Sequence, residues 1–328
     1  LMQSNPGLAG IVREAIGDHC NKNEGLSESL ICSRLADVNQ TSDPQRTIPT
    51  RRISFEESLR DLPKHYASDG DLILSHLAAS LSAVFPDGED FFVRSVRHYR
   101  NDITDPVLKR QVNGFIGQEA MHGREHRALN DRLAELGYPV KTFERLTRKG
   151  LELRTKYAPP AANLAATAAL EHFTATLAEV LLTDERARDE FGYEPLEELF
   201  VWHALEESEH KAVAFDVYKA VGGSERLRVW TMKMLRTGFV VGMAVQVVIS
   251  MLGDSATYKP GNVRRSWRRF RRSPIVSREV WRRLKEYDHP YFHPDDRDTT
   301  ELVAEWRARL FGDEGALNDK LVGAGAAA

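Results

Sequence analysis

The chain has 328 residues and a formal net charge of −3 at pH 7, with 42% hydrophobic and 28% charged residues. This composition is ordinary for a globular protein, and the charge gives no argument for a nucleic-acid partner. The two cysteines, Cys20 and Cys32, exclude a disulfide framework and a thiolate metal site, which fits a reducing setting. The first residues lack the basic and apolar regions of a signal peptide, so we expect a cytoplasmic protein.

Helical periodicity dominates the chain after a poorly patterned start. Residues 1–50 are rich in Ser, Asn, Asp and Gly, and we predict a flexible arm there. Helices are then predicted, in chain order, over residues 69–85, 86–101, 105–136, 142–157, 160–182, 194–220, 224–252 and 299–310. Asp105 before Pro106 is a clear start signal, with a capping acceptor and then a proline in the first turn. Strand signals are nearly absent, so the predicted fold is all-α.

The predicted helix 194–220 carries polar side chains on the face that should be buried. Residues advance about 100° each along a helix, so His203, Glu207 and His210 fall within roughly 60° of one another. Leu199 and Val217 share that side, which is otherwise apolar. Because buried polar groups need a compensating partner, bound cations are the natural explanation for this pattern.

Three other predicted helices interrupt an apolar stripe in the same way. Glu119 and His122 lie three residues apart in the helix 105–136. Glu171 is the only charge in the stripe of its helix, and Glu89 shares its side with apolar residues. Four converging carboxylates would repel one another unless two divalent cations neutralised them. The order Glu, ExxH, Glu, ExxH is the ligand arrangement of ferritin-like di-iron or di-manganese bundles, so we predict a ferritin-like four-helix bundle with additional helices.

The motif HxxxExxH on the last of these helices, after Glu, ExxH and Glu, resembles the bacterial p-aminobenzoate N-oxygenase family. In that family the additional histidine is a third nitrogen ligand. The resemblance implies metal ligands at Glu89, Glu119, His122, Glu171, His203, Glu207 and His210. The stretches FFVRSVRHY, GFIGQEAMHGREH and WHALEESEHKAVAFDVY are also similar to a bacterial family described as predicted metal-dependent hydrolases, over residues 51–310.

Each candidate ligand also has a purely structural explanation. Glu89 would suit the first turn of a helix, where acids favour the helix dipole. Glu171 could pair with an arginine, and the two ExxH motifs could belong to a solvated polar face. The pattern fits His203 equally well as a metal ligand and as a residue that orients a ligand. His126 points toward the same site, and we expect it to orient a ligand or to line a substrate pocket. Glu206 and Glu209 flank the motif, and we expect them to be solvated or to orient ligands.

Carboxylate-rich sites with imidazole suit iron or manganese, and zinc is a further candidate. We therefore predict two iron ions that activate O₂ to hydroxylate, desaturate or N-oxidise an organic, apolar or lipid-like substrate. The alternative is hydrolysis by a hydroxide that bridges two metal ions, and a third class is iron storage without catalysis. No flavin, NAD or Fe–S motif is visible, so an oxidase would take electrons from a separate protein or from its substrate. A homodimer also fits the chain.

Two segments near the C-terminus raise the question of a membrane. Residues 237–253 are uncharged and just long enough to span one, but we favour a buried fifth helix that packs on the bundle. Residues 264–285 hold nine arginines and one acid, Glu279, with interleaved Trp and Phe, a mixture that suits anionic headgroups. No nucleic-acid-binding module accompanies them. We expect a di-metal bundle over residues 51–255, a basic extension over 256–328, and peripheral attachment to the inner face of the membrane.

Overall fold

The computed structural model describes residues 48–323. The chain divides into two units, residues 1–43 and 44–328, and all described residues lie in the second. The predicted N-terminal arm therefore lies almost wholly outside the described residues. Among the described residues every regular element is a helix, and β pairing is limited to two isolated bridges. The all-α prediction is confirmed.

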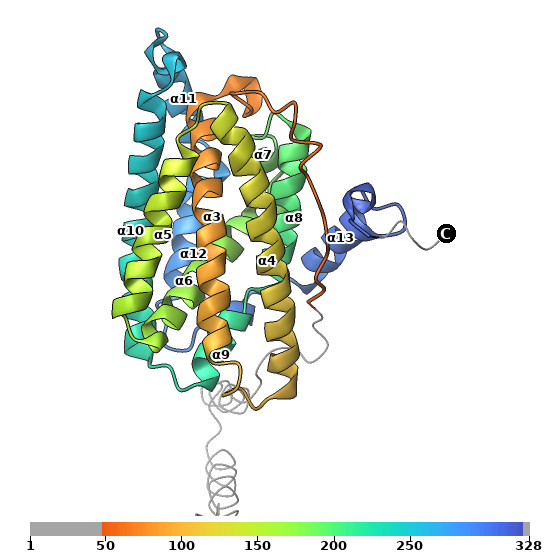
Figure 1. The fold of residues 1–328 in the computed structure, drawn as a ribbon, viewed down its shortest axis with the longest axis vertical. Coiled ribbons are helices and arrows are strands. Elements are labelled where there is room, and N and C mark those ends of the chain that lie inside the picture. The colour runs from red at the N-terminus through yellow and green to blue at the C-terminus, as the bar shows by residue number, and fades with distance from the viewer. Residues whose placement is uncertain (1–47, 324–328) are drawn as a thin grey trace, which may run out of the picture. The chain divides into compact units, whose positions relative to one another are not determined.

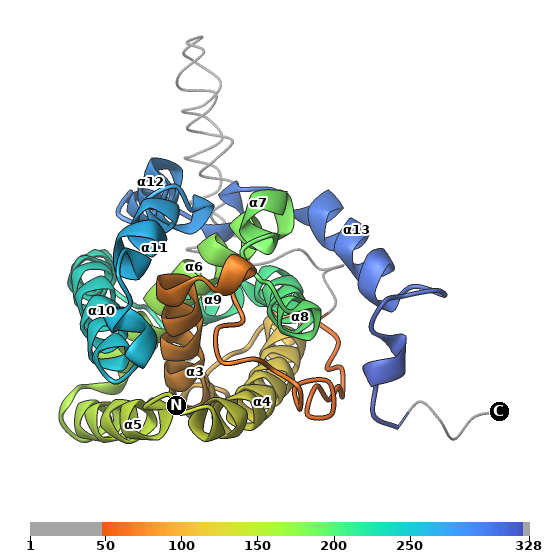
Figure 2. The same cartoon turned by 90° about the horizontal axis from the view of Figure 1, so that it is seen from above.

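Four long helices surround the centre of the described unit. They are α3 (Leu72–His98), α4 (Pro106–Glu135), α6 (Pro160–Thr183) and α8 (Glu194–His210). Both α3 and α8 pack on α4 and on α6, so the four helices form a closed ring (Figure 2). Its interior is filled by apolar side chains such as Val112, Phe115, Leu164 and Leu199. The assignment of this ring to the ferritin-like bundles stays a prediction.

Local signals place the helix ends where the sequence predicts them. Asp105 accepts a hydrogen bond from the Val107 backbone N–H at 2.9 Å and caps α4. Ser224 accepts one from the Leu227 N–H at 3.3 Å and caps α10 (Glu225–Leu252). After α4, Gly137 adopts a φ of +88°, which a side chain would disfavour. The helices predicted over 105–136, 160–182 and 224–252 are confirmed.

One continuous helix, α3, replaces the two predicted over 69–85 and 86–101. Pro86 lies inside α3 and has no N–H to donate to the Ser82 carbonyl four residues earlier. Asn130 on α4 provides the missing donor, because its Nδ2 lies 2.9 Å from the Ser82 carbonyl oxygen. Asn130 also accepts from Ser82 Oγ at 2.7 Å and donates to Glu144 Oε1 at 2.9 Å. The predicted break was wrong because a neighbouring helix satisfies the carbonyl that proline leaves free.

We expect Asn130→Ala to destabilise the fold by roughly 1–3 kcal/mol, because the buried Ser82 carbonyl loses its donor. Pro86→Ala restores a helical N–H to that carbonyl, so the double variant should regain part of the loss. Urea unfolding of the four proteins gives the coupling free energy, which we expect at roughly 0.5–3 kcal/mol. A coupling of zero would mean that Asn130 stabilises α3 through other groups.

The predicted helix 194–220 is interrupted. It ends as α8 at His210, and α9 (Val213–Ala220) follows after Lys211 and Ala212. Lys211 is buried at this interruption, and its Nζ donates to the backbone oxygen of Arg297 at 2.5 Å. Because this contact joins residues far apart in the chain, local periodicity could not reveal it.

The remaining helices lie against the ring (Figure 1). They are α5 (Val140–Tyr157) on α3 and α4, α10 on α3 and α6, α11 (Asn262–Phe270) on α3, α12 (Arg278–Glu286) on α6, and α13 (Thr300–Phe311) on α8; the short α7 (Glu185–Arg188) contacts α6. The described part of the predicted basic extension therefore packs on the ring helices. Neither α11 nor α12 was predicted as a helix from the sequence. The predicted domain boundaries stay predictions.

The fifth helix predicted over 237–253 does pack on the ring helices, but the prediction that it is buried was wrong, because only one side of α10 is covered. Met243 and Val247 face the ring and are buried, whereas Val241 is 57% exposed and Val248 is 55% exposed. The helix packs on α3 and α6 on one side, and no described residue covers the other. Among the described helices, α10 alone is long and apolar enough to cross a membrane, by length and composition only.

Candidate metal centre

Seven polar side chains from four helices converge inside the ring. They are Glu89 from α3, Glu119 and His122 from α4, Glu171 from α6, and His203, Glu207 and His210 from α8. All seven side chains are buried. Glu89 lies in the interior of α3, which removes the explanation of an acid in the first turn of a helix. The four interrupted apolar stripes therefore face one common core.

Three of these residues form a first group, Glu119, Glu171 and His210, whose donor atoms lie within 4.8 Å of one another. The Nε2 atom of His210 is 3.1 Å from Glu119 Oε1 and 3.4 Å from Glu171 Oε2. Two carboxylates and an imidazole around one point are donors that iron, manganese and zinc all accept.

A second group contains more imidazole. Glu89 and Glu119 approach His122 within the same 4.8 Å, and so do His203 and Glu207. The Oε1 atom of Glu207 lies 2.9 Å from His203 Nε2 and 3.6 Å from His122 Nδ1. It is also 3.6 Å from the Nε2 atom of His210 in the first group. Glu119 and Glu207 thus reach both groups, which is the position that a bridging carboxylate needs.

Most donor atoms of this centre make no hydrogen bond, and His210 Nε2 meets the nearby carboxylates only at ion-pair distances of 3.1 to 3.6 Å. Both side-chain oxygens of Glu89, Glu119 and Glu171 are buried without one, and so is Oε2 of Glu207. Two of the imidazole nitrogens that face them, His122 Nδ1 and His210 Nε2, are also buried and make no hydrogen bond. Buried polar atoms without a partner are rare in proteins, and bound cations would satisfy all of these. The residues present therefore fit a pair of metal ions.

The electrostatics agree with this fit. Burial, reinforced by the neighbouring carboxylates, raises the pKa of Glu89 and Glu119 well above the usual value and that of Glu171 to about 7. Burial also lowers the pKa of His122 well below the usual value, which keeps the imidazole neutral. Glu207 differs, because His210 and His203 outweigh its burial and hold its pKa well below the usual range. Cations bound here would have to displace protons.

The second nitrogen of each imidazole is held by another side chain. The pairs are His122 Nε2 with Glu206 Oε2 at 3.1 Å, His203 Nδ1 with His126 Nε2 at 2.8 Å, and His210 Nδ1 with Gln118 Oε1 at 2.8 Å. Partners of this kind fix the orientation and tautomer of metal-binding histidines. His126 and Glu206 are both buried, so the alternative of a solvated Glu206 was wrong, and their role in orienting ligands stays a prediction.

Two of these partners depend on Arg51. Its Nη1 donates to Glu206 Oε1 at 2.9 Å, and its Nη2 donates to Glu209 Oε1 at 2.7 Å. Gln118 donates in turn to Glu209 Oε2 at 2.6 Å. One guanidinium therefore supports the partners of both His122 and His210. Neither Arg51 nor Gln118 was predicted from the sequence. Arg51 in particular lies outside the helices and 155 residues before Glu206, so no local pattern connects the two.

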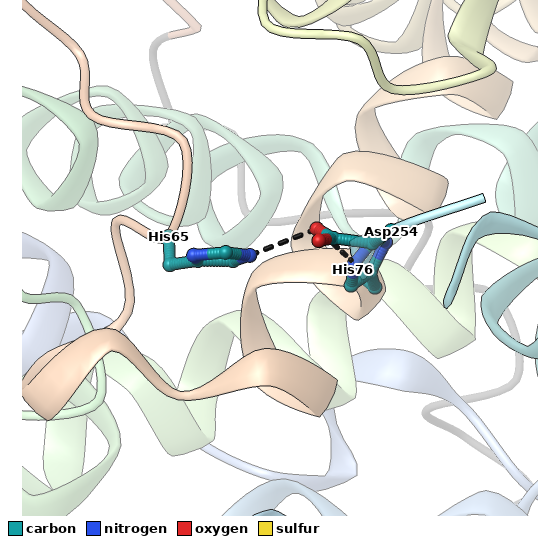
Figure 3. A group of neighbouring side chains, drawn as sticks. All are labelled: His65, His76 and Asp254. Carbon is teal, nitrogen blue, oxygen red and sulfur yellow. Dashed lines mark hydrogen bonds and ion pairs between the residues drawn. The ribbon is translucent and has the colours of Figure 1, made fainter. Parts of the chain in front are cut away.

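Another group of polar side chains lies nearer the start of α3, roughly 20 Å along the helix from Glu89. His65 and His76 both point at Asp254, with Nε2 to Oδ2 distances of 2.8 and 3.3 Å (Figure 3). The Nζ atom of Lys64 lies 3.5 Å from the same oxygen, and the Ala256 N–H donates to Oδ1 at 2.9 Å. Because an ammonium already neutralises this carboxylate, the group acts as a polar contact between the ends of α3 and α10.

These features define an all-α protein whose helices carry a buried candidate metal centre. Residues 49–298 match a family described as predicted metal-dependent hydrolases. Since the match covers most of the chain, the protein belongs to this family, as its motifs predicted. The matched range contains Arg51 and all seven residues of the centre. Comparisons with curated proteins and with solved structures found no match.

Proposed function

We propose that this protein is an enzyme that uses two metal ions bound inside the ring. The supporting observation is the set of buried carboxylate oxygens and imidazole nitrogens that have no hydrogen-bond partner. The proposed ligands are Glu89, Glu119, His122, Glu171, His203, Glu207 and His210. Four carboxylates match the charge of two divalent cations, and Glu119 and Glu207 reach both groups.

Hydrolysis is the reaction that we propose first, because it agrees with the family description. Two divalent cations at this centre would supply Lewis acidity and lower the pKa of bound water. The chain itself orients the imidazoles through His126, Glu206 and Gln118. It also keeps bulk water away from the centre, since all seven proposed ligands are buried.

An apolar channel leads away from the centre and indicates the kind of substrate. His203 and Glu207 line its inner part, and leucines of α3 and α6 such as Leu77 and Leu177 line its walls. Its empty space is about 1000 Å³ with the open part included. Pockets with such an apolar lining bind molecules with a large apolar part. We therefore propose an apolar or lipid-like organic substrate.

Oxidation with O₂ is the second candidate, and the composition of the centre favours it. Four carboxylates among seven donors, all on helices of one ring, are typical of di-iron and di-manganese carboxylate proteins. Iron or manganese would then be the resident metal, and an external protein or the substrate would supply electrons. Zinc would agree better with hydrolysis, because it has no redox chemistry.

Metal analysis and two assays separate these candidates. Elemental analysis of protein from metal-replete cells should give about two ions per chain. Acyl esters of p-nitrophenol should be hydrolysed without O₂ by the zinc- or manganese-loaded protein if the first proposal holds. An optical change of the Fe(II)-loaded protein on exposure to O₂, without ester turnover, would favour oxidation instead. Protein that binds no metal under any of these conditions would contradict both.

We also propose that the protein attaches peripherally to anionic membranes. The exposed side of α10 is apolar at Val241, Val245 and Val248, and the arginines of residues 264–272 supply positive charge nearby. Co-sedimentation with phosphatidylglycerol vesicles at low salt should exceed that with phosphatidylcholine, and Val245→Glu should weaken it. If a second copy covers this side instead, the protein should sediment as a dimer that Val245→Glu dissociates, and vesicle binding should be absent.

A further inference from the structure

A hollow lined by arginines lies on the outside of the described unit. Its lining includes Arg186 of α7 and five arginines in or next to α11, namely Arg264, Arg265, Arg268, Arg269 and Arg272. Three acids, Asp69, Asp189 and Glu190, share the hollow. Six guanidinium groups against three carboxylates make its lining net positive.

Several of these guanidinium groups are available to a ligand. Arg269 pairs with Asp69 at 2.8 Å, and Arg186 pairs with Asp184 at 2.7 Å. In contrast, no hydrogen bond or ion pair joins the side chains of Arg264, Arg268 and Arg272 to a described residue, and Arg272 donates only its backbone N–H, to Arg269 O at 2.8 Å. Arg264 and Arg268 are one helical turn apart and therefore share a face of α11. Guanidinium groups placed in this way suit the oxygens of a phosphate or a carboxylate.

The hollow adjoins the apolar channel. Glu190 lines both spaces, and Ser273 Oγ donates to its Oε2 at 2.8 Å. Pro274 lines the hollow while the next residue, Ile275, lines the channel. Figure 1 agrees, since α7 and α11 lie at the same end of the ring.

The channel is long as well as apolar. Its α3 wall extends from Leu74 to Phe85, a rise of roughly 16 Å along the helix. Phe85 packs at the inner end against His203, with ring centroids 5.1 Å apart. A molecule that occupied both spaces would have a charged end in the hollow and an extended apolar part that reaches the proposed metal ions.

We propose that the arginine hollow binds the anionic headgroup of a single-chain amphiphile whose alkyl chain fills the channel as far as the metal centre. This inference rests on the proposed function, because it names the substrate class of the same centre. It also places the headgroup away from the metal ions, so the headgroup serves recognition. The bond that reacts would then lie within the chain of the amphiphile. It would belong to an internal ester if the reaction is hydrolysis and to an alkyl carbon if the reaction is oxidation.

Calorimetric titration of the purified full-length protein tests this inference with three probes: dodecyl phosphate below its micelle concentration, dodecanol and inorganic phosphate. Dodecyl phosphate should bind at least about tenfold more tightly than either of the others, because only it uses both spaces. Arg268→Glu should remove that advantage. Arg271→Glu is the matched control, since Arg271 is exposed on the same segment but does not line the hollow.

Two further variants separate the possible failures. Leu77→Trp should obstruct the channel and weaken dodecyl phosphate and dodecanol alike, and circular dichroism checks that it folds. Glu119→Gln should reduce the metal content but leave dodecyl phosphate binding intact, because Glu119 does not line the channel. Failure of metal binding and failure of amphiphile binding can therefore be told apart. Equal affinity for dodecyl phosphate and dodecanol, or an equal effect of Arg268→Glu and Arg271→Glu, would overturn it.

Discussion

Glu119→Gln should reduce the metal content of the purified protein from about two ions per chain to one or fewer. The reason is its position, since Glu119 reaches both groups of donors and an amide is a poorer ligand than a carboxylate. The same substitution should stabilise the metal-free protein at pH 7, because burial raises the pKa of Glu119, so folding must protonate this carboxyl group, and an amide carries no such cost. Glu119→Gln would thus weaken metal binding and stabilise the metal-free protein.

The pKa of Glu119 determines whether the stability of the metal-free protein rises or falls with pH. Burial and Glu171 raise the pKa of Glu119 above its value in the unfolded chain. The unfolded state therefore loses this proton first as the pH rises, and the metal-free protein loses stability from about pH 4.5 upward. Glu119→Gln should flatten this part of the profile in urea unfolding of chelator-treated protein.

The matched control for Glu119 is Glu135→Gln, an exposed position on the same helix that should change neither metal content nor stability. The competing explanation is an ion pair of Glu119 with His210, whose Nε2 lies 3.1 Å away. In that case Glu119→Gln would destabilise the metal-free protein and leave its metal content unchanged. That pair of results would contradict the metal centre.

Arg51→Met should destabilise the protein by roughly 3–5 kcal/mol, because it leaves the buried carboxyl group of Glu206 without its cation, whereas Glu209 keeps an ion pair with Arg307 at 2.8 Å. It should also weaken metal binding by about 10- to 100-fold, since residues that hold ligating imidazoles have effects of this size. Both His122 and His210 depend on this network, through Glu206 and through Gln118. Urea unfolding and competition with a metal-binding dye measure the two effects.

Two comparisons establish whether Arg51 acts through charge. Arg52→Met changes an exposed neighbour and should alter neither stability nor metal affinity. Combining Arg51→Met with Glu206→Gln removes the uncompensated charge and should recover much of the stability, since Glu209 keeps Arg307 as a partner. If Arg51→Met lowers stability while metal affinity stays constant, Arg51 supports the fold but not the orientation of the imidazoles.

The convergence of the seven residues could be predicted from the sequence because each of them interrupts an apolar stripe. A stripe of helical period must face a core, and four such stripes in one short chain share the same core. The same local logic placed the caps at Asp105 and Ser224, where a side-chain oxygen meets free backbone N–H groups.

Three features could not be predicted from local periodicity and capping, because each depends on contacts between residues far apart in the chain. Pro86 predicts a break, yet α3 continues because Asn130 satisfies the Ser82 carbonyl from another helix. The apolar segment 237–253 predicts a buried helix, yet α10 packs on one side only.

Arg51 is the third such feature, since it donates to Glu206 from a position 155 residues earlier in the chain. By itself, then, the sequence determined the helices and the residues that turn inward, because both follow from local periodicity and capping. Only the tertiary structure decided which side chains orient the imidazoles, where the channel runs and what adjoins it, because these depend on packing between segments far apart in the chain.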